Sequence, residues 1–156
     1  MKNIITFISF LLLSIFLSPF NAKGVEKETI HYEEITLGCL ILGRDIRGEH
    51  IINNNIDYQK LLIARNLYSP DCSAYELPAI DFTKNTLIGY VSSVGGCQLP
   101  EVTKQITKIN NDYSVNINIV QQGLCKRNNP IVFWGLIPKI DDNANVQFTI
   151  VKKLNK

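Results

Sequence analysis

Four cysteines are the residues with the clearest chemical potential in this chain of 156 residues. They are Cys39, Cys72, Cys97 and Cys125. Thiols form disulfides, bind zinc or act as nucleophiles, and zinc sites commonly use a Cys-x-x-Cys pair, which this sequence lacks. The two histidines, His31 and His50, are not spaced as a ligand pair either. We therefore expect disulfides, and neither a metal nor another cofactor.

Other catalytic patterns do not occur in the sequence. It contains no Gly-x-Ser-x-Gly elbow, no phosphate loop and no His-Glu-x-x-His pair. The acidic pairs Glu33-Glu34 and Asp141-Asp142 are adjacent, and neighbours on a strand point to opposite faces. An enzyme would have to use Asp81, His31 or His50, and nothing in the sequence sets these three at a common site. We expect a protein that is not an enzyme.

The segment around His50 leaves a binding role open. His50 follows Arg44 and Arg47 in a stretch punctuated by Gly38, Gly43 and Gly48. Such a cluster could bind an anion, but a glycine-punctuated surface loop is the interpretation we favour.

The start of the chain predicts export. Lys2 precedes the apolar run Ile4–Phe20, and the small residues Ala22 and Gly24 follow. This order is typical of a secretory signal peptide, here residues 1–24. The alternative is an uncleaved anchor, but the run is short against the roughly 20 residues of a spanning helix. We expect an exported protein, periplasmic or secreted, with no membrane span after cleavage, in a compartment that favours disulfides.

Residues 25–156 then form a single β-rich domain, which suits their length. The formal net charge of +2 includes Lys2, which leaves with the signal, so the mature protein is near neutral. Nucleic-acid binding would show as clustered basic residues, and we expect none.

Hydrophobic periodicity predicts one helix and several strands. Tyr58, Leu61 and Leu62 share one helical face after the capping asparagines 53–55, so we place a helix near residues 56–66. Strands are expected at 27–37, 86–91, 101–109, 113–121, 131–137 and 145–151. The fold class is mainly β (α+β), a small β-sandwich or partly open barrel with one helix and two disulfides.

The stretch 131–137 is apolar on both sides, which predicts a central strand. It holds Trp134, the only tryptophan, for which a core position is the default and a binding anchor the alternative. Because adjacent strand residues face opposite ways, one of Phe133 and Trp134 could lie on the surface.

The predicted hairpin bears on the cysteine pairing. If it closes near Asn111, positions whose numbers add up to about 222 lie opposite each other, as Cys97 and Cys125 do. Placing apolar residues on one face requires an odd sum, so a one-residue bulge at Gly95, Gly96 or Pro100 is needed. We predict Cys97–Cys125, which leaves Cys39–Cys72.

The sequence from Asp81 onward resembles known envelope proteins. Asp-Phe-Thr-Lys-Asn-Thr-Leu-Ile-Gly at 81–89, with Gly95-Gly96, is similar to the opening of the C-terminal domain of PrcB-type protease-complex subunits. Gly96-Cys97, Gly123-Leu124-Cys125, Trp134, Pro138-Lys139 and Val146–Ile150 resemble cysteine-bearing small uncharacterised envelope proteins of Bacteroidota.

The resemblance covers roughly residues 56–151 and rests on short, mostly structural motifs. It implies an exported β-domain with a Cys97–Cys125 bridge, and an accessory role beside an envelope protease. It transfers no catalytic residues. The chain departs from the PrcB type in having cysteines, and from many of the second group in lacking a lipoprotein cysteine after the apolar run.

Our first functional hypothesis is a non-catalytic interaction module that binds another exported or envelope protein, with protease inhibition as a special case. The expected contacts are Lys126, Arg127 and Asn128, which a bridge at Cys125 would hold in place. The alternative is a small-ligand carrier, with a cavity in the sheet lined by 131–137.

Overall fold

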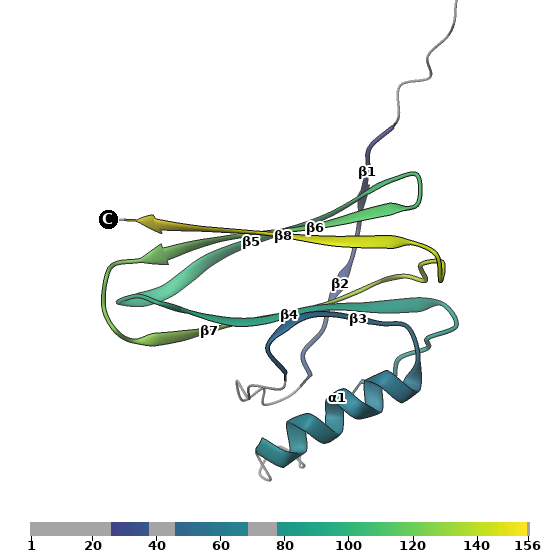
Figure 1. The fold of residues 1–156 in the computed structure, drawn as a ribbon, viewed down its shortest axis with the longest axis horizontal. Coiled ribbons are helices and arrows are strands. Elements are labelled where there is room, and N and C mark those ends of the chain that lie inside the picture. The colour runs from purple at the N-terminus through teal and green to yellow at the C-terminus, as the bar shows by residue number, and fades with distance from the viewer. Residues whose placement is uncertain (1–25, 38–45, 69–77, 156) are drawn as a thin grey trace, which may run out of the picture.

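The described residues form two stacked β-sheets, with one helix against the outer face of one of them (Figure 1). A computed structural model describes residues 26–37, 46–68 and 78–155. The first sheet has the order β1–β5–β6–β8, formed by Glu28–Ile30, Gln98–Ile109, Asp112–Gln122 and Asn145–Asn155. The second sheet has the order β2–β7–β4–β3, formed by Glu33–Glu34, Asn128–Pro138, Asn85–Gly95 and Gly48–Ile52. The predicted mainly β fold is confirmed as an open sandwich, not a closed barrel.

Strands β4 to β7 form one long two-stranded ribbon that is bent back on itself. Its tip is the turn at Asn110, where Ile109 lies opposite Asp112 and the φ of Asn110 is 55°. Past the bend, β4 and β7 continue the ribbon in the second sheet, beginning with Gly95 opposite Asn128. The bend therefore joins the two sheets at one end of the molecule (Figure 1).

The hairpin register agrees with the predicted faces. Ile106 lies opposite Val115, which is the odd sum that the apolar pattern required. The register shifts between Gln98 and Glu101, a stretch that contains the predicted bulge position Pro100. The predicted bulge had to raise the sum of the paired residue numbers toward 222. The observed shift lowers that sum instead, since Gln98 lies opposite Gln122. The cysteines consequently meet in the bend, beyond the ends of β5 and β6.

A first core fills the space between the sheets. On β6, Val115, Ile117 and Ile119 face it and are fully buried, and the polar residues between them lie on the other face. The second sheet contributes Ile88, Tyr90, Val94, Ile131, Phe133 and Ile137. This alternation on β6 confirms the half-buried strand that its sequence predicted.

A second core lies between the outer face of the second sheet and the helix α1 (Asn55–Tyr68). It contains Leu37, Ile46, Ile52, Tyr58, Leu61, Leu62, Leu87, Val91 and Trp134. Because the second sheet is covered on both faces, Phe133 and Trp134 are each only 1% exposed. Neither residue takes the possible surface position, and the default core position of Trp134 is confirmed.

The helix α1 begins where the asparagine-rich stretch predicted it. The backbone N–H of Asp57 donates to Asn54 Oδ1 (2.9 Å), and Asn54 Nδ2 donates to Asp57 Oδ2 (2.8 Å). Lys60 Nζ lies 2.7 Å from the same carboxylate. Its hydrogen bond, followed by that from Asn54, holds the pKa of Asp57 below its ordinary value.

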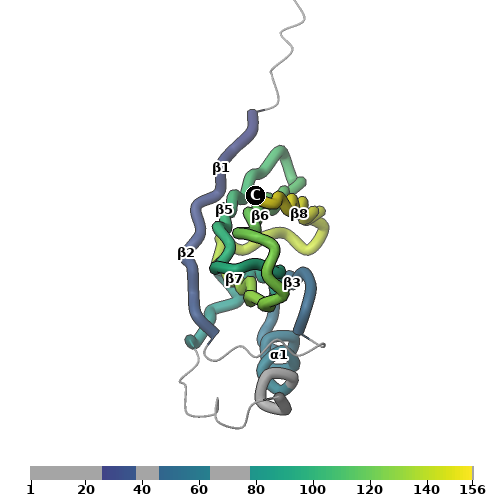
Figure 2. Tube along the Cα trace, turned by 90° about the vertical axis from the view of Figure 1, so that its left-hand side faces the viewer, coloured from purple at the N-terminus to yellow at the C-terminus, as the bar shows by residue number. Residues whose placement is uncertain are grey.

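Two local predictions are wrong. The expected strand 27–37 consists of two short strands, β1 and β2, because this segment leaves β5 in one sheet and joins β7 in the other (Figure 2). The stretch around His50, which we interpreted as a loop, contains the edge strand β3, with His50 opposite Gly89. Its glycine and charges conceal the strand, which exists because β4 offers a free edge.

Candidate binding site at the disulfide-linked bend

Cys97 and Cys125 form the predicted disulfide, with their Cα atoms 4.7 Å apart. Cys97 lies between β4 and β5, and Cys125 lies between β6 and β7. The bond therefore crosslinks the two strands of the ribbon where the ribbon bends. Cys39 and Cys72 lie outside the described residues, and their pairing stays a prediction.

Backbone contacts hold the two halves of the bend together. Gly96 N–H donates to the carbonyl of Cys125 (3.0 Å), and Cys97 N–H donates to the carbonyl of Gln122 (2.6 Å). Gly123 has a φ of 75°, and a Cβ there would lie 2.7 Å from Cys97 Sγ. Glycine at position 123 is thus required by the backbone conformation and by the close approach of the disulfide.

The amide of Asn129 fixes the bend from the β7 side. This side chain is fully buried, and its Nδ2 donates to the carbonyls of Gly96 (3.2 Å) and Gln98 (3.0 Å). A covalent bond and hydrogen bonds from both strands therefore hold the bend. Side chains carried by it are presented on a preorganised scaffold.

Several residues at the bend are exposed, and we call five of them the bend surface: Leu99, Leu124, Lys126, Arg127 and Asn128. Leu124 is 74% exposed and Leu99 is 67% exposed, although both are large and apolar. Each lies within two residues of a bridged cysteine, so the disulfide brings them to the same end of the molecule.

The charge of the bend surface is positive and unpaired. The ion pairs in the described part of the chain are Asp57–Lys60, Asp81–Lys84 and Glu34–Lys104, so Lys126 and Arg127 have no carboxylate partner there. The nearby Glu101 accepts a hydrogen bond from Gln122 Nε2 at 3.1 Å. Exposed leucines beside free cations suit recognition of an apolar and acidic surface.

The predicted contacts Lys126, Arg127 and Asn128 thus occupy the exposed end, but Leu99 and Leu124 were missed. The usable signal was their position, since each is an apolar residue next to a predicted disulfide in a segment rich in turn residues.

Trp134 does not belong to the bend surface. It lies six residues beyond Asn128 on β7, which is about 20 Å of extended strand. It borders a pocket of about 320 Å³ formed by Pro130, Val132 and Trp134 on one side and by residues 34–37 on the other. Its indole Nε1 is buried and has no hydrogen-bond partner among the residues that the structure describes.

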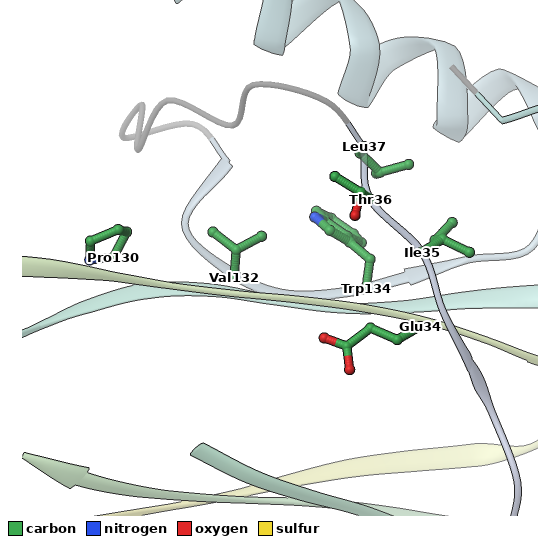
Figure 3. A pocket seen from close by; sticks show the side chains of 7 residues that line it. All are labelled: Glu34, Ile35, Thr36, Leu37, Pro130, Val132 and Trp134. Carbon is green, nitrogen blue, oxygen red and sulfur yellow. The ribbon is translucent and has the colours of Figure 1, made fainter. Parts of the chain in front are cut away.

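Figure 3 shows how this pocket is arranged. Pro130, Val132 and Trp134 project toward the helix side of the second sheet, whereas the carboxylate of Glu34 points to the opposite side. That carboxylate accepts bonds of 2.7 and 2.8 Å from Lys104 Nζ. Glu34 is therefore engaged across the sandwich and supplies no charge to the pocket.

The candidate catalytic residues do not converge. His31 is exposed between β1 and β2, whereas His50 is half-buried in β3, with Nε2 3.0 Å from the carbonyl of Ile46. The His50 ring centroid lies 5.2 Å from that of Trp134. Asp81 precedes β4 in a separate turn, so the three residues share no site.

Asp81 has a structural role in that turn. Its Oδ1 accepts hydrogen bonds from the hydroxyl and the backbone N–H of Thr83. These bonds, the hydroxyl first, hold the pKa of Asp81 below its ordinary value. Lys84 Nζ adds an ion pair at 3.5 Å. The Asp-Phe-Thr-Lys motif is thus a turn that introduces β4.

The remaining charged candidates are also dispersed. Glu33, Asp141 and Asp142 are exposed. Arg44 of the possible anion cluster and the predicted signal peptide, residues 1–24, lie outside the described residues. No group of three or more His, Cys, Asp or Glu within the described ranges could hold a metal ion.

Among the residues that the structure describes, no helix is both long enough and apolar enough to span a membrane. No protein-family model, curated protein sequence or solved structure matches this chain.

Proposed function

We propose that this chain is an exported, non-catalytic interaction module that binds another exported or envelope protein through the bend surface. One observation carries the proposal: two exposed leucines and two unpaired cations are held on a bend fixed by a disulfide and by buried hydrogen bonds. A preorganised apolar centre with charged neighbours is the arrangement that binds a protein partner at low entropic cost.

The export part of the proposal rests on the first 24 residues together with the disulfide. A charged start, an apolar run and small residues are typical of a signal peptide, and disulfides persist in oxidising compartments. Mass spectrometry of the protein from its own cells should give a chain that starts after Ala22 or Gly24. A chain retaining Met1 in the cytoplasm would remove this part of the proposal.

The resemblance to PrcB-type subunits favours an envelope protease as the partner, with the present chain as an accessory subunit or an inhibitor. Lys126 and Arg127 are exposed beside a disulfide, which would keep the two ends of a cleaved loop attached if that loop entered a protease cleft. An inhibitor would lower the activity of the captured protease, whereas an accessory subunit would leave it unchanged or raise it.

The test is a cross-linking capture of the tagged protein from its own cell envelope, read by mass spectrometry. The double variant Leu124→Ser with Lys126→Glu should lower partner recovery about tenfold or more, because interface anchors dominate binding energy. The matched control is Ile56→Ser with Lys27→Glu, which makes the same chemical changes at exposed residues away from the bend.

Equal recovery with the bend variant and the control variant would remove the bend surface from the proposal. If the wild-type protein recovers no stoichiometric partner and behaves as an isolated molecule, the proposal of an interaction module is itself wrong.

A small-ligand carrier remains the alternative, with the pocket beside Trp134 in place of a cavity inside the sheets. The inner-face residues of 131–137 are buried in the first core, so they leave little space for a ligand there. The indole N–H, which has no partner within residues 26–37, 46–68 and 78–155, favours a ligand with a hydrogen-bond acceptor. A bound molecule in native mass spectra, lost in Val132→Trp, would support it, and apo spectra from gently purified protein would count against it.

A further inference from the structure

Strand β8 is a long edge that only one neighbour covers. It pairs in parallel with β6 along its whole length, from Asn145 opposite Asp112 to Asn155 opposite Gln122. On its other side no strand follows in the described part of the chain, as the end-on view also shows (Figure 2). Alternate backbone N–H and C=O groups of such an edge point outward without a partner.

The first part of this edge lacks the usual protection against pairing. Residues 145–151 read Asn-Val-Gln-Phe-Thr-Ile-Val, with no charge, proline or glycine. Natural proteins guard exposed edges with charged residues, proline or bulges, and an uncharged β-prone segment of this length pairs readily with another strand. The only charged residues on β8 are Lys152 and Lys153, near its end.

We propose that β8 pairs with β8 of a second copy of this chain, in antiparallel orientation about a two-fold axis at Ile150. The two first sheets then become one continuous eight-stranded sheet. A two-fold interface requires a self-complementary patch, and the sequence of β8 meets that requirement.

The side chains fit this register on both faces. Leu154, which is 39% exposed, lies opposite Val146 of the other copy, and Val151, which is 37% exposed, lies opposite Thr149. Both exposed apolar residues therefore gain a cross-strand neighbour.

The charges fit the register as well. Lys152 lies opposite Phe148, and Lys153 lies opposite Gln147, so no two lysines meet. Sliding the strands by two residues shortens the ladder. Sliding them by four toward the C-terminal end of β8 brings Lys152 opposite its own copy, which like-charge repulsion disfavours, and sliding them by four the other way shortens the ladder further.

The dimer would carry two bend surfaces. The end of β8 lies beside the bend, where Gly123 N–H donates to the carbonyl of Asn155 (3.3 Å). Because the two copies run in opposite directions, their bend surfaces lie at opposite ends of the joined sheet. Dimerisation is inferred from β8 alone, and its test below contains no partner, so its failure would leave the proposed function untouched.

The test is the dimer dissociation constant of the exported chain, purified with its disulfide intact, from sedimentation equilibrium over a range of concentrations. In the double variant Thr149→Lys with Val151→Lys, position 149 of each copy lies opposite position 151 of the other. Two pairs of introduced lysines therefore face each other. The variant should raise the dissociation constant about a hundredfold or abolish the dimer. Both positions are exposed on the outer face, so the fold should tolerate the change.

Two further variants isolate the mechanism. Thr103→Lys with Gln105→Lys adds the same charge to the exposed outer face of β5, an inner strand, and should leave the dissociation constant within about threefold of wild type. Thr149→Lys with Val151→Glu places opposite charges across the axis and should restore dimerisation. A monomeric wild-type protein, an equal effect of the β5 control, or failure of the charge swap to restore the dimer would each overturn the inference.

Discussion

The two sheets differ in how many of their faces are covered. The second sheet packs against the first sheet on one side and against α1 on the other, so adjacent residues such as Leu87 and Ile88 are both fully buried. In the part of the chain that the structure describes, the first sheet is covered on its inner face only, and Ile117 is buried while its neighbour Asn116 is not. The number of covered faces, and not the strand itself, decides which periodicity the sequence shows.

The largest expected effect is a difference in the free energy of unfolding between substitutions on the outer faces of the two sheets. Trp134→Ala removes a side chain that fills the second core above Gly89, where any Cβ would overlap the indole ring. It should lower the free energy of unfolding by about 3–5 kcal/mol. Asn116→Ala, on the outer face of the first sheet, should change it by less than about 0.5 kcal/mol. Urea unfolding followed by circular dichroism measures both, and comparable losses would contradict the difference between the sheets.

The next effect concerns the bend that joins the sheets. Cys97→Ser with Cys125→Ser opens a loop with a sequence separation of 28 residues. The free energy of unfolding should fall by about 3.5 kcal/mol, because the unfolded chain regains the entropy of that loop. Thermal or urea unfolding of the oxidised protein and the variant tests this. A loss below about 1 kcal/mol would mean that the hydrogen bonds of Asn129 and the backbone hold the bend unaided.

A smaller effect should be confined to the second sheet. Asn54→Ala removes the cap of α1 and should cost about 1 kcal/mol. Since α1 covers the second sheet alone, amide hydrogen exchange should rise in α1 and β3 and stay unchanged in β6 and β8. Asn55→Ala, one residue farther on and without the capping hydrogen bond, is the matched control. A uniform rise across both sheets would mean that the two layers open together.

The smallest effect lies in the turn that introduces β4. Hydrogen bonds from Thr83 lower the pKa of Asp81 in the folded state, so they contribute stability above the pKa of the unfolded chain. That contribution is lost as the pH falls through the lowered folded value. Thr83→Val should raise the Asp81 pKa toward its ordinary value in an NMR titration. The stability difference from wild type should disappear in acid, and an unchanged pKa would assign the shift to the backbone N–H of residue 83 and to Lys84.

Much of the fold follows from local patterns in the sequence. The alternation on β6, the helical face of Tyr58, Leu61 and Leu62, and the central position of 131–137 are each written in short segments. The hairpin predicted the Cys97–Cys125 bond, because the ribbon continues past its bend in nearly the same register. Strand β2 was predicted only as part of one longer strand, and β3 was interpreted as a loop. Neither could be predicted locally, because they exist only where β7 and β4 offer an edge.

The candidate site was predictable only in part. Lys126, Arg127 and Asn128 follow from their place beside a predicted disulfide, whereas the exposure of Leu99 and Leu124 depends on how the ribbon bends. The burial of both Phe133 and Trp134 could not be read from one strand, since it requires that a helix far away in the sequence cover the second sheet.

The bent ribbon also has a consequence for how the chain folds. The turn at Asn110 closes the smallest possible loop, and each further pair of β5 and β6 adds little entropic cost, so the ribbon can zip from its tip. Cys97 and Cys125 come within reach only after that zipping reaches the bend, and β4 and β7 pair beyond them. The parallel pairing of β8 with β6 joins segments on either side of β7 in the sequence and raises the contact order, so we expect it to form late. The time at which the thiols of Cys97 and Cys125 are oxidised would therefore report when pairing has passed from the hairpin of β5 and β6 to the strands of the second sheet.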